Sequence, residues 1–343
     1  MSTTNNLFNE LEREKRFNQK SNPLEEFKTL IDWEIYRDEL ESMYSHKNGK
    51  GGRPPYDAVL MFKILFLQRL YNLSDDEMEF HLLDRRSFQK FLDIEKEDKI
   101  PDAKTIWVFR ERINEENLEK VLFEKLNYWL KNVGKIIRSG SIIDASFVEV
   151  PIQRNKQDEN KQIKENKVPE DWKSKPHKMC QKDTDARWTK KNNQSYYGYK
   201  QHAVVDSGSK LIEDYEVTEA SVHDSVTAPD LLERLKKESE LHADSAYNSD
   251  DIKTTVMEKK LKANICKKGA RNNPLTDEDK SYNKEVSKVR ARVEHVFGDI
   301  EKFGGDFIRT IGKRRAEVQI FLISFVYNLR RYNFLKGCSM SSY

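Results

Sequence analysis

Three acidic side chains, far apart along the chain, are the residues best suited to chemistry. Asp144 interrupts the apolar run at 142–145, and Asp244 ends a short apolar segment at 241–244. A charged group in such a place is costly to desolvate unless something pairs with it. Glu294 follows Arg290 by four residues, so both lie on one side of a helix. If the three carboxylates meet, their mutual repulsion requires divalent cations.

Mg²⁺ is the natural occupant of such a pocket, with Mn²⁺ as a substitute, because it prefers oxygen ligands and shares them with phosphates. Two such ions about 3.5–4 Å apart activate a water or sugar hydroxyl and stabilise the leaving oxygen. Arg290, Lys200 and His202 are placed to contact flanking phosphates. Simpler interpretations stay open. Each aspartate can be a turn or cap residue, and Arg290 and Glu294 can form a surface pair. The three basic residues can equally take part in structural salt bridges.

The elements that must position these acids alternate between strand and helix after Gly140. We expect strands at 141–150, 197–205, 211–217, 240–244 and 262–266, and helices at 228–237 and 249–260. A further helix is indicated by an apolar stripe at steps of three or four, formed by Val286, Val289, Val293, Val296, Ile300 and Phe303. This succession predicts a layered α/β domain. Residues 151–195 are lysine-rich and poor in aliphatics, which predicts a long loop and a candidate for disorder.

The first part of the chain is predicted to be helical. Residues 56–71 are apolar all round, as in a buried helix, and Ser74 with Glu77 forms a capping box that begins the next one. Further helices are expected from Pro101 to Arg112 and over 115–133. The predicted organisation is a polar segment at 1–55, an all-α domain at 56–134, an α/β domain at 141–335 with a basic insertion at 151–195, and a tail at 336–343.

The overall charge is nearly balanced, since 61 basic and 58 acidic residues give a formal net charge of +3. The distribution is uneven: 13 basic against 7 acidic residues over 151–200, and 12 against 6 over 281–343. Two segments of about +6 each suit a polyanionic partner. The chain shows no secretion signal and no spanning segment, and its three cysteines are too few for a disulfide scaffold. We therefore expect a cytoplasmic protein with no membrane contact.

Several motifs, in order along the chain, resemble those of insertion-sequence transposases with an Asp-Asp-Glu triad, of the group named after insertion sequences four and five. They are IDAS at 143–146, YGYKQH at 197–202, VHD at 222–224, ADSAY at 243–247, RARVEHVFG at 290–298 and FLISFVYNLRR at 321–331. The segment from RPPYD at 53–57 to PDAKTIWVFR at 101–110 resembles the N-terminal domain of this family. Two positions depart from the family signature around Glu294: Ser287 replaces a tyrosine, and Glu301 replaces a lysine.

The resemblance implies a ribonuclease H-like catalytic domain with a mixed five-stranded sheet flanked by helices. It further implies that Asp144, Asp244 and Glu294 bind Mg²⁺. The implied reaction is nicking at the ends of the element, followed by attack of the 3′-hydroxyls on target DNA. The implied partners are double-stranded DNA, as terminal inverted repeats and as target, and a second copy of the chain in a homodimer.

Recognition of the terminal repeats is expected in the helical domain. The candidate contacts with phosphates or base edges are Arg85, Arg86, Lys104, Arg110 and Arg112, although each can equally be a solvated helix charge. Trp172, Trp188 and Tyr196 can stack on DNA bases or pack on the protein. Two rival functions remain: a metal-dependent nuclease of the same fold, which cuts without joining, and a non-catalytic DNA-binding protein derived from a transposase.

Overall fold

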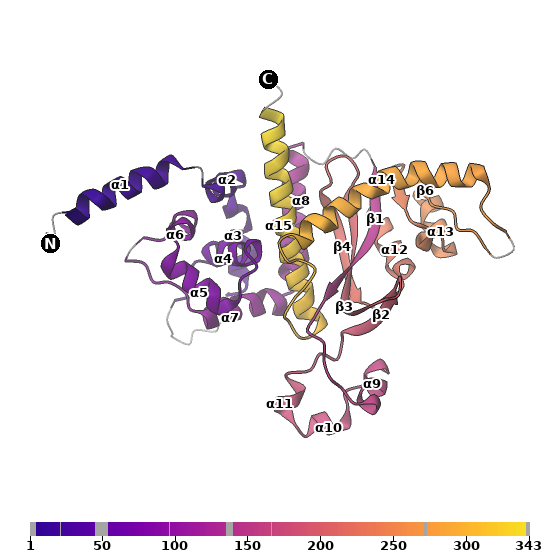
Figure 1. Cartoon of the computed structure of the whole chain (residues 1–343), viewed down its shortest axis with the longest axis horizontal. Coiled ribbons are helices and arrows are strands. Elements are labelled where there is room, and N and C mark those ends of the chain that lie inside the picture. Colours follow the sequence, from indigo (N-terminus) through magenta and orange to yellow (C-terminus); the bar gives the residue numbers. More distant parts are fainter. Residues whose placement is uncertain are drawn as a thin grey trace.

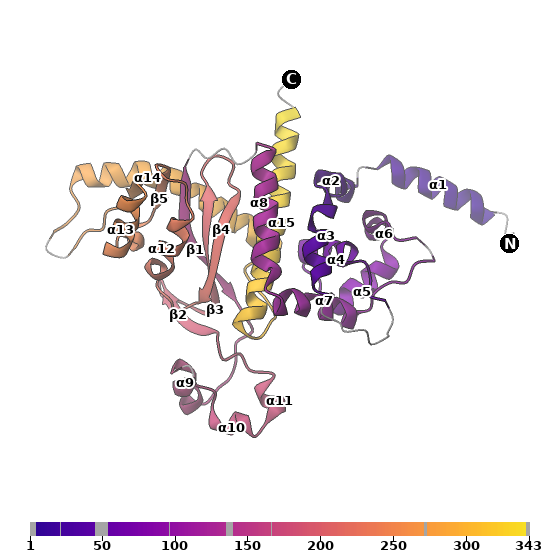
Figure 2. The ribbon, with the colours of Figure 1, turned by 180° about the vertical axis from the view of Figure 1, so that it is seen from behind.

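A central helix near the C-terminus separates a helical region from a mixed β-sheet in the computed structural model, which describes residues 5–20, 22–44, 54–95, 97–134, 140–165, 167–270 and 273–340. Figure 1 shows this helix, α15 (Lys313–Met340), with the early helices on one side and the sheet on the other. The view from behind in Figure 2 shows α8 (Leu118–Asn132) lying alongside α15. The tail expected at 336–343 is corrected, since α15 continues through Met340.

The helical region includes elements on both sides of residue 56, the predicted start of the all-α domain. Its elements are α1 (Asn5–Gln19), α2 (Pro23–Leu30), η1 (Trp33–Tyr36), α3 (Arg37–Ser42), α4 (Ala58–Leu70), α5 (Asp75–Asp84), α6 (Arg86–Leu92), α7 (Ala103–Glu115) and α8. The capping box of Ser74 and Glu77 at the start of α5 is confirmed. The segment 1–55 is not simply polar, because Leu30, Trp33 and Tyr36 are buried in the core.

In the part of the chain described, the sheet has six strands rather than five. They are β1 (Ser141–Glu149), β2 (Arg187–Lys191), β3 (Gln194–Asp206), β4 (Ile212–Glu219), β5 (Glu240–Ala243) and β6 (Lys262–Ile265). The order is β2-β3-β1-β5-β6, with β4 also paired to β3. β1 runs antiparallel to β3 and parallel to β5, so it is the strand on which the two halves of the sheet meet.

Helices cover both faces of the sheet, and strand alternation assigns each residue of β1 to one of them. Ile143 packs with α12 (Asp224–Glu233) and α13 (Asp250–Glu258), in an apolar cluster that includes Tyr247 of the short helix η2 (Ser245–Tyr247). Ile142 belongs instead to the core formed with α14 (Asp277–Glu301) and α15. Asp144, two residues after Ile142, therefore faces α14.

The predicted loop at 151–195 is wrong for most of its length. It contains α9 (Gln157–Lys164), α10 (Glu170–Lys173), α11 (Pro176–Met179) and strand β2, and the helices form a lobe below the sheet in Figure 1. Trp172 is fully buried in this lobe, and its indole nitrogen donates to Glu159 Oε1 at 2.7 Å. The short helices carry no apolar period, so the order comes from this tertiary contact rather than from local pattern.

One apolar core joins the helical region to the sheet. Phe325 of α15 contacts the rings of Trp33, Tyr36 and Phe62, with centroid distances of 6.1, 5.7 and 5.1 Å. The same helix places Asn328 against β4, where its side chain hydrogen-bonds both main-chain groups of Ile212. Within the described residues, no helix is long and apolar enough to cross a membrane.

Gly198 is required where β3 pairs with the end of β1, opposite Glu149. Its φ is +150°, and a Cβ at this position would collide with the carbonyl oxygen of Val148. We expect Gly198→Ala to lower the free energy of unfolding by about 3 kcal/mol, because both strands must shift.

Gly298 on α14 is the matched control for this substitution. Among the residues described, no atom lies within 4 Å of the position that an added methyl group would take, and alanine favours the helix by up to about 1 kcal/mol. Urea unfolding followed by circular dichroism measures both variants, and equal stabilities would contradict the close approach of the two strands as the reason for this glycine.

Candidate active site

Asp144 and Asp244 come together because β1 and β5 run side by side in the same direction. Ser141 pairs with Leu241 and Ile142 with His242, and this register, continued by two residues, brings Asp244 next to Asp144. Asp244 directly follows β5 and caps η2, accepting a hydrogen bond from the Ala246 amide at 2.7 Å. Asp144 Oδ1 accepts from the Ala145 amide at 2.9 Å. Both aspartates are therefore held by the backbone.

Arg290 supplies the positive charge at this carboxylate pair. Its Nη2 donates to Asp144 Oδ2 at 2.9 Å, and the two side chains are 19% and 14% exposed. Burial raises the pKa of Asp144, the guanidinium of Arg290 opposes the rise, and the charge of Asp244 adds to it. The pKa of Arg290 is raised, with burial opposing the effect of Asp144 and Asp244. This contact with Asp144 was not predicted, because the sequence suggested contacts of Arg290 with flanking phosphates.

Glu294 is placed differently from the two aspartates. It lies one turn after Arg290 on α14 and is exposed. The apolar stripe that orients this helix is buried at Val286, Val293, Val296 and Ile300. Its part in the site stays a prediction.

The two aspartates fit a divalent cation held by protein carboxylates on one side. Mg²⁺ is commonly bound through one or two carboxylates, with phosphate oxygens and water as its other ligands. Asp144 and Asp244 offer such oxygens at a partly buried point where negative charge is only partly compensated. In the described part of the chain, no three His, Cys, Asp or Glu side chains are grouped to hold a metal ion. The donor set present is therefore two carboxylates.

Lys200 and His202 lie on the opposite face of the sheet, turned away from Asp144. Lys200 Nζ donates to Asp224 Oδ1 at 2.8 Å and to the Val222 carbonyl at 2.7 Å. His202 is fully buried, its Nε2 lies 2.9 Å from Thr218 Oγ1, and burial lowers its pKa to about 4. Both side chains point into the protein, and Lys200 forms a salt bridge, which was its alternative interpretation; the expected phosphate contacts of the two residues stay a prediction.

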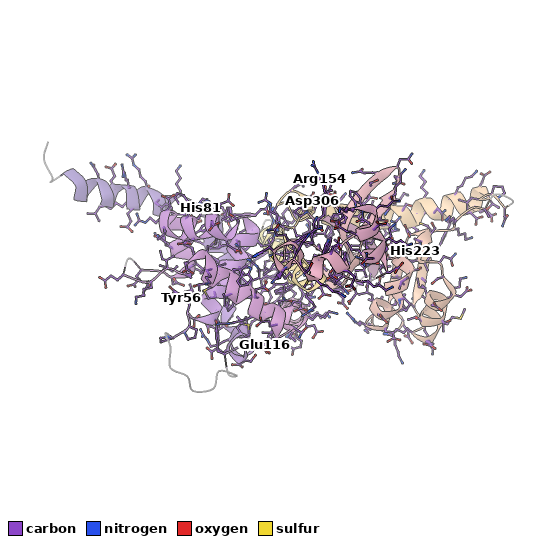
Figure 3. All side chains as sticks on the ribbon, turned by 90° about the horizontal axis from the view of Figure 1, so that it is seen from below. Tyr56, His81, Glu116, Arg154, His223 and Asp306 are labelled. Carbon is purple, nitrogen blue, oxygen red and sulfur yellow. The ribbon has the colours of Figure 1, made fainter. Side chains whose placement is uncertain are left out.

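Asp224 is a neighbour of the site for which no role was predicted. It begins α12, next to His223, which is labelled in Figure 3. The charges of Asp224, Asp144 and Asp244 all raise the pKa of Tyr247, after the larger effect of burial. Asp224 is the last residue of the VHD motif, and this motif was the signal in the sequence that could have indicated it.

The basic residues of the helical region differ in how far other side chains engage them and in their exposure to solvent. Arg110 donates two hydrogen bonds of 2.8 Å to Asp75 and is largely buried, and its expected DNA contact stays a prediction. Arg86 pairs with Glu14, and Arg85 stacks on Tyr71 and Phe88. Lys104 is exposed at the start of α7.

The aromatic residues in and next to the insertion differ in how far they are buried. Trp172 is a core residue of the lobe, whereas Trp188 on β2 is 47% exposed. Tyr196 stacks on Phe147 with ring centroids 4.3 Å apart. The packing alternative therefore holds for Trp172.

Comparison with known proteins places this site in a family. Residues 136–329, more than half of the chain, match the family described as "Transposase DDE domain", and residues 11–112 match "Transposase domain (DUF772)". A cryo-EM structure of the piggyBac transposase synaptic complex with hairpin DNA aligns over 87% of this chain and 74% of that one, with 10% identity and a TM-score of 0.40. The first match spans Asp144, Asp244 and Glu294. The chain belongs to the family of transposases with a DDE domain.

Proposed function

We propose that this protein is an insertion-sequence transposase of the group named after insertion sequences four and five, with a ribonuclease H-like catalytic domain. It nicks the ends of its element and joins the 3′-hydroxyls to target DNA. The observation that carries the proposal is the pair Asp144 and Asp244 on adjoining strands, beside Arg290, within the matched transposase domain. A second copy of the chain and the terminal repeats are the proposed partners, and the nucleoid is the proposed place of action.

In this reaction the side chains hold the metal ion and the DNA in place, and none of them acts as the nucleophile. Asp144 and Asp244 would hold Mg²⁺, or Mn²⁺ in its place, which when bound activates the attacking oxygen and stabilises the leaving one. Glu294 completes the ligand set in this proposal, which requires α14 to bring it closer to the aspartates. The guanidinium of Arg290 has the fork geometry that matches two oxygens of a phosphate. Phosphoryl transfer by this route forms no covalent intermediate with the protein.

The decisive experiment is strand transfer into a supercoiled target. The protein is incubated with duplexes that carry the element end, with Mg²⁺ or with EDTA. We expect metal-dependent nicking at the element end and covalent joining to the plasmid. Nicking without joining would favour the nuclease, and binding without either would favour the non-catalytic DNA-binding protein.

A further inference from the structure

Both oxygens of Asp144 accept a hydrogen bond from the protein itself. Oδ1 accepts from the Ala145 amide, and Oδ2 accepts from Arg290 Nη2, each at 2.9 Å. Each oxygen has a second lone pair. A guanidinium and a divalent cation on one oxygen nevertheless repel each other strongly, since both are positive at contact distance and shielded from solvent. A metal ion that binds Asp144 must therefore compete with Arg290.

Of the two partners of Asp144, Arg290 is the one that can leave. The Ala145 amide belongs to β1, where Ala145 is paired with His202 of β3. Helix α14 is packed through buried Val286 and Val293 on either side of Arg290, and rotation of the Arg290 side chain alone is enough to take the guanidinium away from Asp144. The Nε of Arg290 is buried and has no hydrogen-bond partner among the described residues, which leaves part of its donor capacity unused in this position.

We propose that Arg290 and the divalent ion compete for Asp144 Oδ2, and that the guanidinium gives up this position when DNA binds. The guanidinium transfers from Asp144 to a phosphate of the DNA, and Asp144 Oδ2 becomes available to the metal. This inference rests on the proposed function. It makes metal and DNA binding mutually dependent, because each ligand removes Arg290 from the position that opposes the other, and such coupling is reciprocal. The DNA-free protein then has little tendency to load a metal and cut at random.

The test measures Mn²⁺ affinity of the full chain, without activity, by the electron paramagnetic resonance signal of free Mn²⁺. Wild type is compared with R290Q, R290K and K288Q, where Lys288 lies on the same helix but pairs with exposed Glu285. Without DNA, R290Q is expected to bind Mn²⁺ at least about tenfold more tightly than wild type, the usual effect of one hydrogen bond to a charged group. R290K retains the charge and stays closer to wild type, and K288Q matches wild type.

DNA provides the second arm of the experiment. Duplex carrying the element end should tighten Mn²⁺ binding in wild type, and should tighten it much less in R290Q. The effect of DNA on the Mn²⁺ affinity of wild type can be measured without any variant, so this arm stays informative even if R290Q folds poorly. Thermal unfolding shows whether R290Q is folded.

Two negative outcomes are distinguishable. If D144N loses Mn²⁺ while R290Q binds it no more tightly than wild type, or if DNA leaves the wild-type affinity unchanged, the exchange is overturned and the proposed function stands. If no Mn²⁺ binding depends on Asp144 with or without DNA, the proposed function itself fails.

Discussion

Asp144→Asn is expected to reduce metal-dependent strand cleavage by about 10³-fold or more, the scale on which charge stabilisation at a reacting phosphate acts. Asparagine keeps the shape of the side chain and an oxygen that can accept from the Ala145 amide. It removes the negative charge that a cation needs. Asp244→Asn should have a similar effect, because an amide oxygen there can still cap η2. Cleavage of a labelled element end gives the rate, and gel-shift assays give the affinity for DNA.

The matched control is Asp299→Asn, a change on α14 at a side chain that forms an ion pair with Lys302. It should cleave at the wild-type rate. The Asp144 variant also leaves Arg290 without its main counter-charge, at a cost of about 1–3 kcal/mol in stability, so thermal unfolding must accompany the assay. Folded Asp144→Asn protein that binds DNA and still cleaves within tenfold of wild type would refute its role.

Phe325→Ala is expected to lower the free energy of unfolding by about 3–5 kcal/mol, as for other large aromatics removed from a core. The side chain is fully buried and contacts rings from η1, α4 and α15 itself. Because this cluster joins the helical region to α15, and α15 packs on β4, we expect both regions to lose stability in one transition. Denaturant unfolding monitored by tryptophan fluorescence and by circular dichroism measures this.

Phe334→Ala on the same helix is the control. Its ring is 58% exposed, so the change in stability should stay within about 0.5 kcal/mol. Two well-separated transitions in the Phe325 variant would show that the helical region and the sheet are independent, against a core that is continuous between them.

The strands that carry the aspartates were predictable because their pattern is local. Alternation and apolar runs located β1 and β5 within a few residues of their ends, and the capping box located the start of α5. The place of Arg290 beside the packed edge of α14 followed from the apolar stripe, since Val293 is buried, but its contact with Asp144 was not predicted. Periodicity of this kind requires no knowledge of the partner surface.

Other features depended on contacts that no local pattern encodes. Alternation puts Lys200 and His202 on one face of β3, but it does not say that α12 covers this face and Asp224 receives Lys200. The lobe at 151–195 was missed because α10 and α11 are four residues long, and Glu159 meets Trp172 only after the chain turns back. The exposure of Glu294 likewise depends on how closely α14 approaches the strand ends.

The position of α15 has a consequence for synthesis. The aromatic cluster that closes the helical region needs Phe321 and Phe325, which are translated about 190 residues after the end of α8. Domains usually fold as they leave the ribosome, beginning with the N-terminal one. Here the first helices must wait with apolar faces uncovered until nearly the whole chain has been made, so a polypeptide released early would be a substrate for chaperones and proteases rather than a partial enzyme.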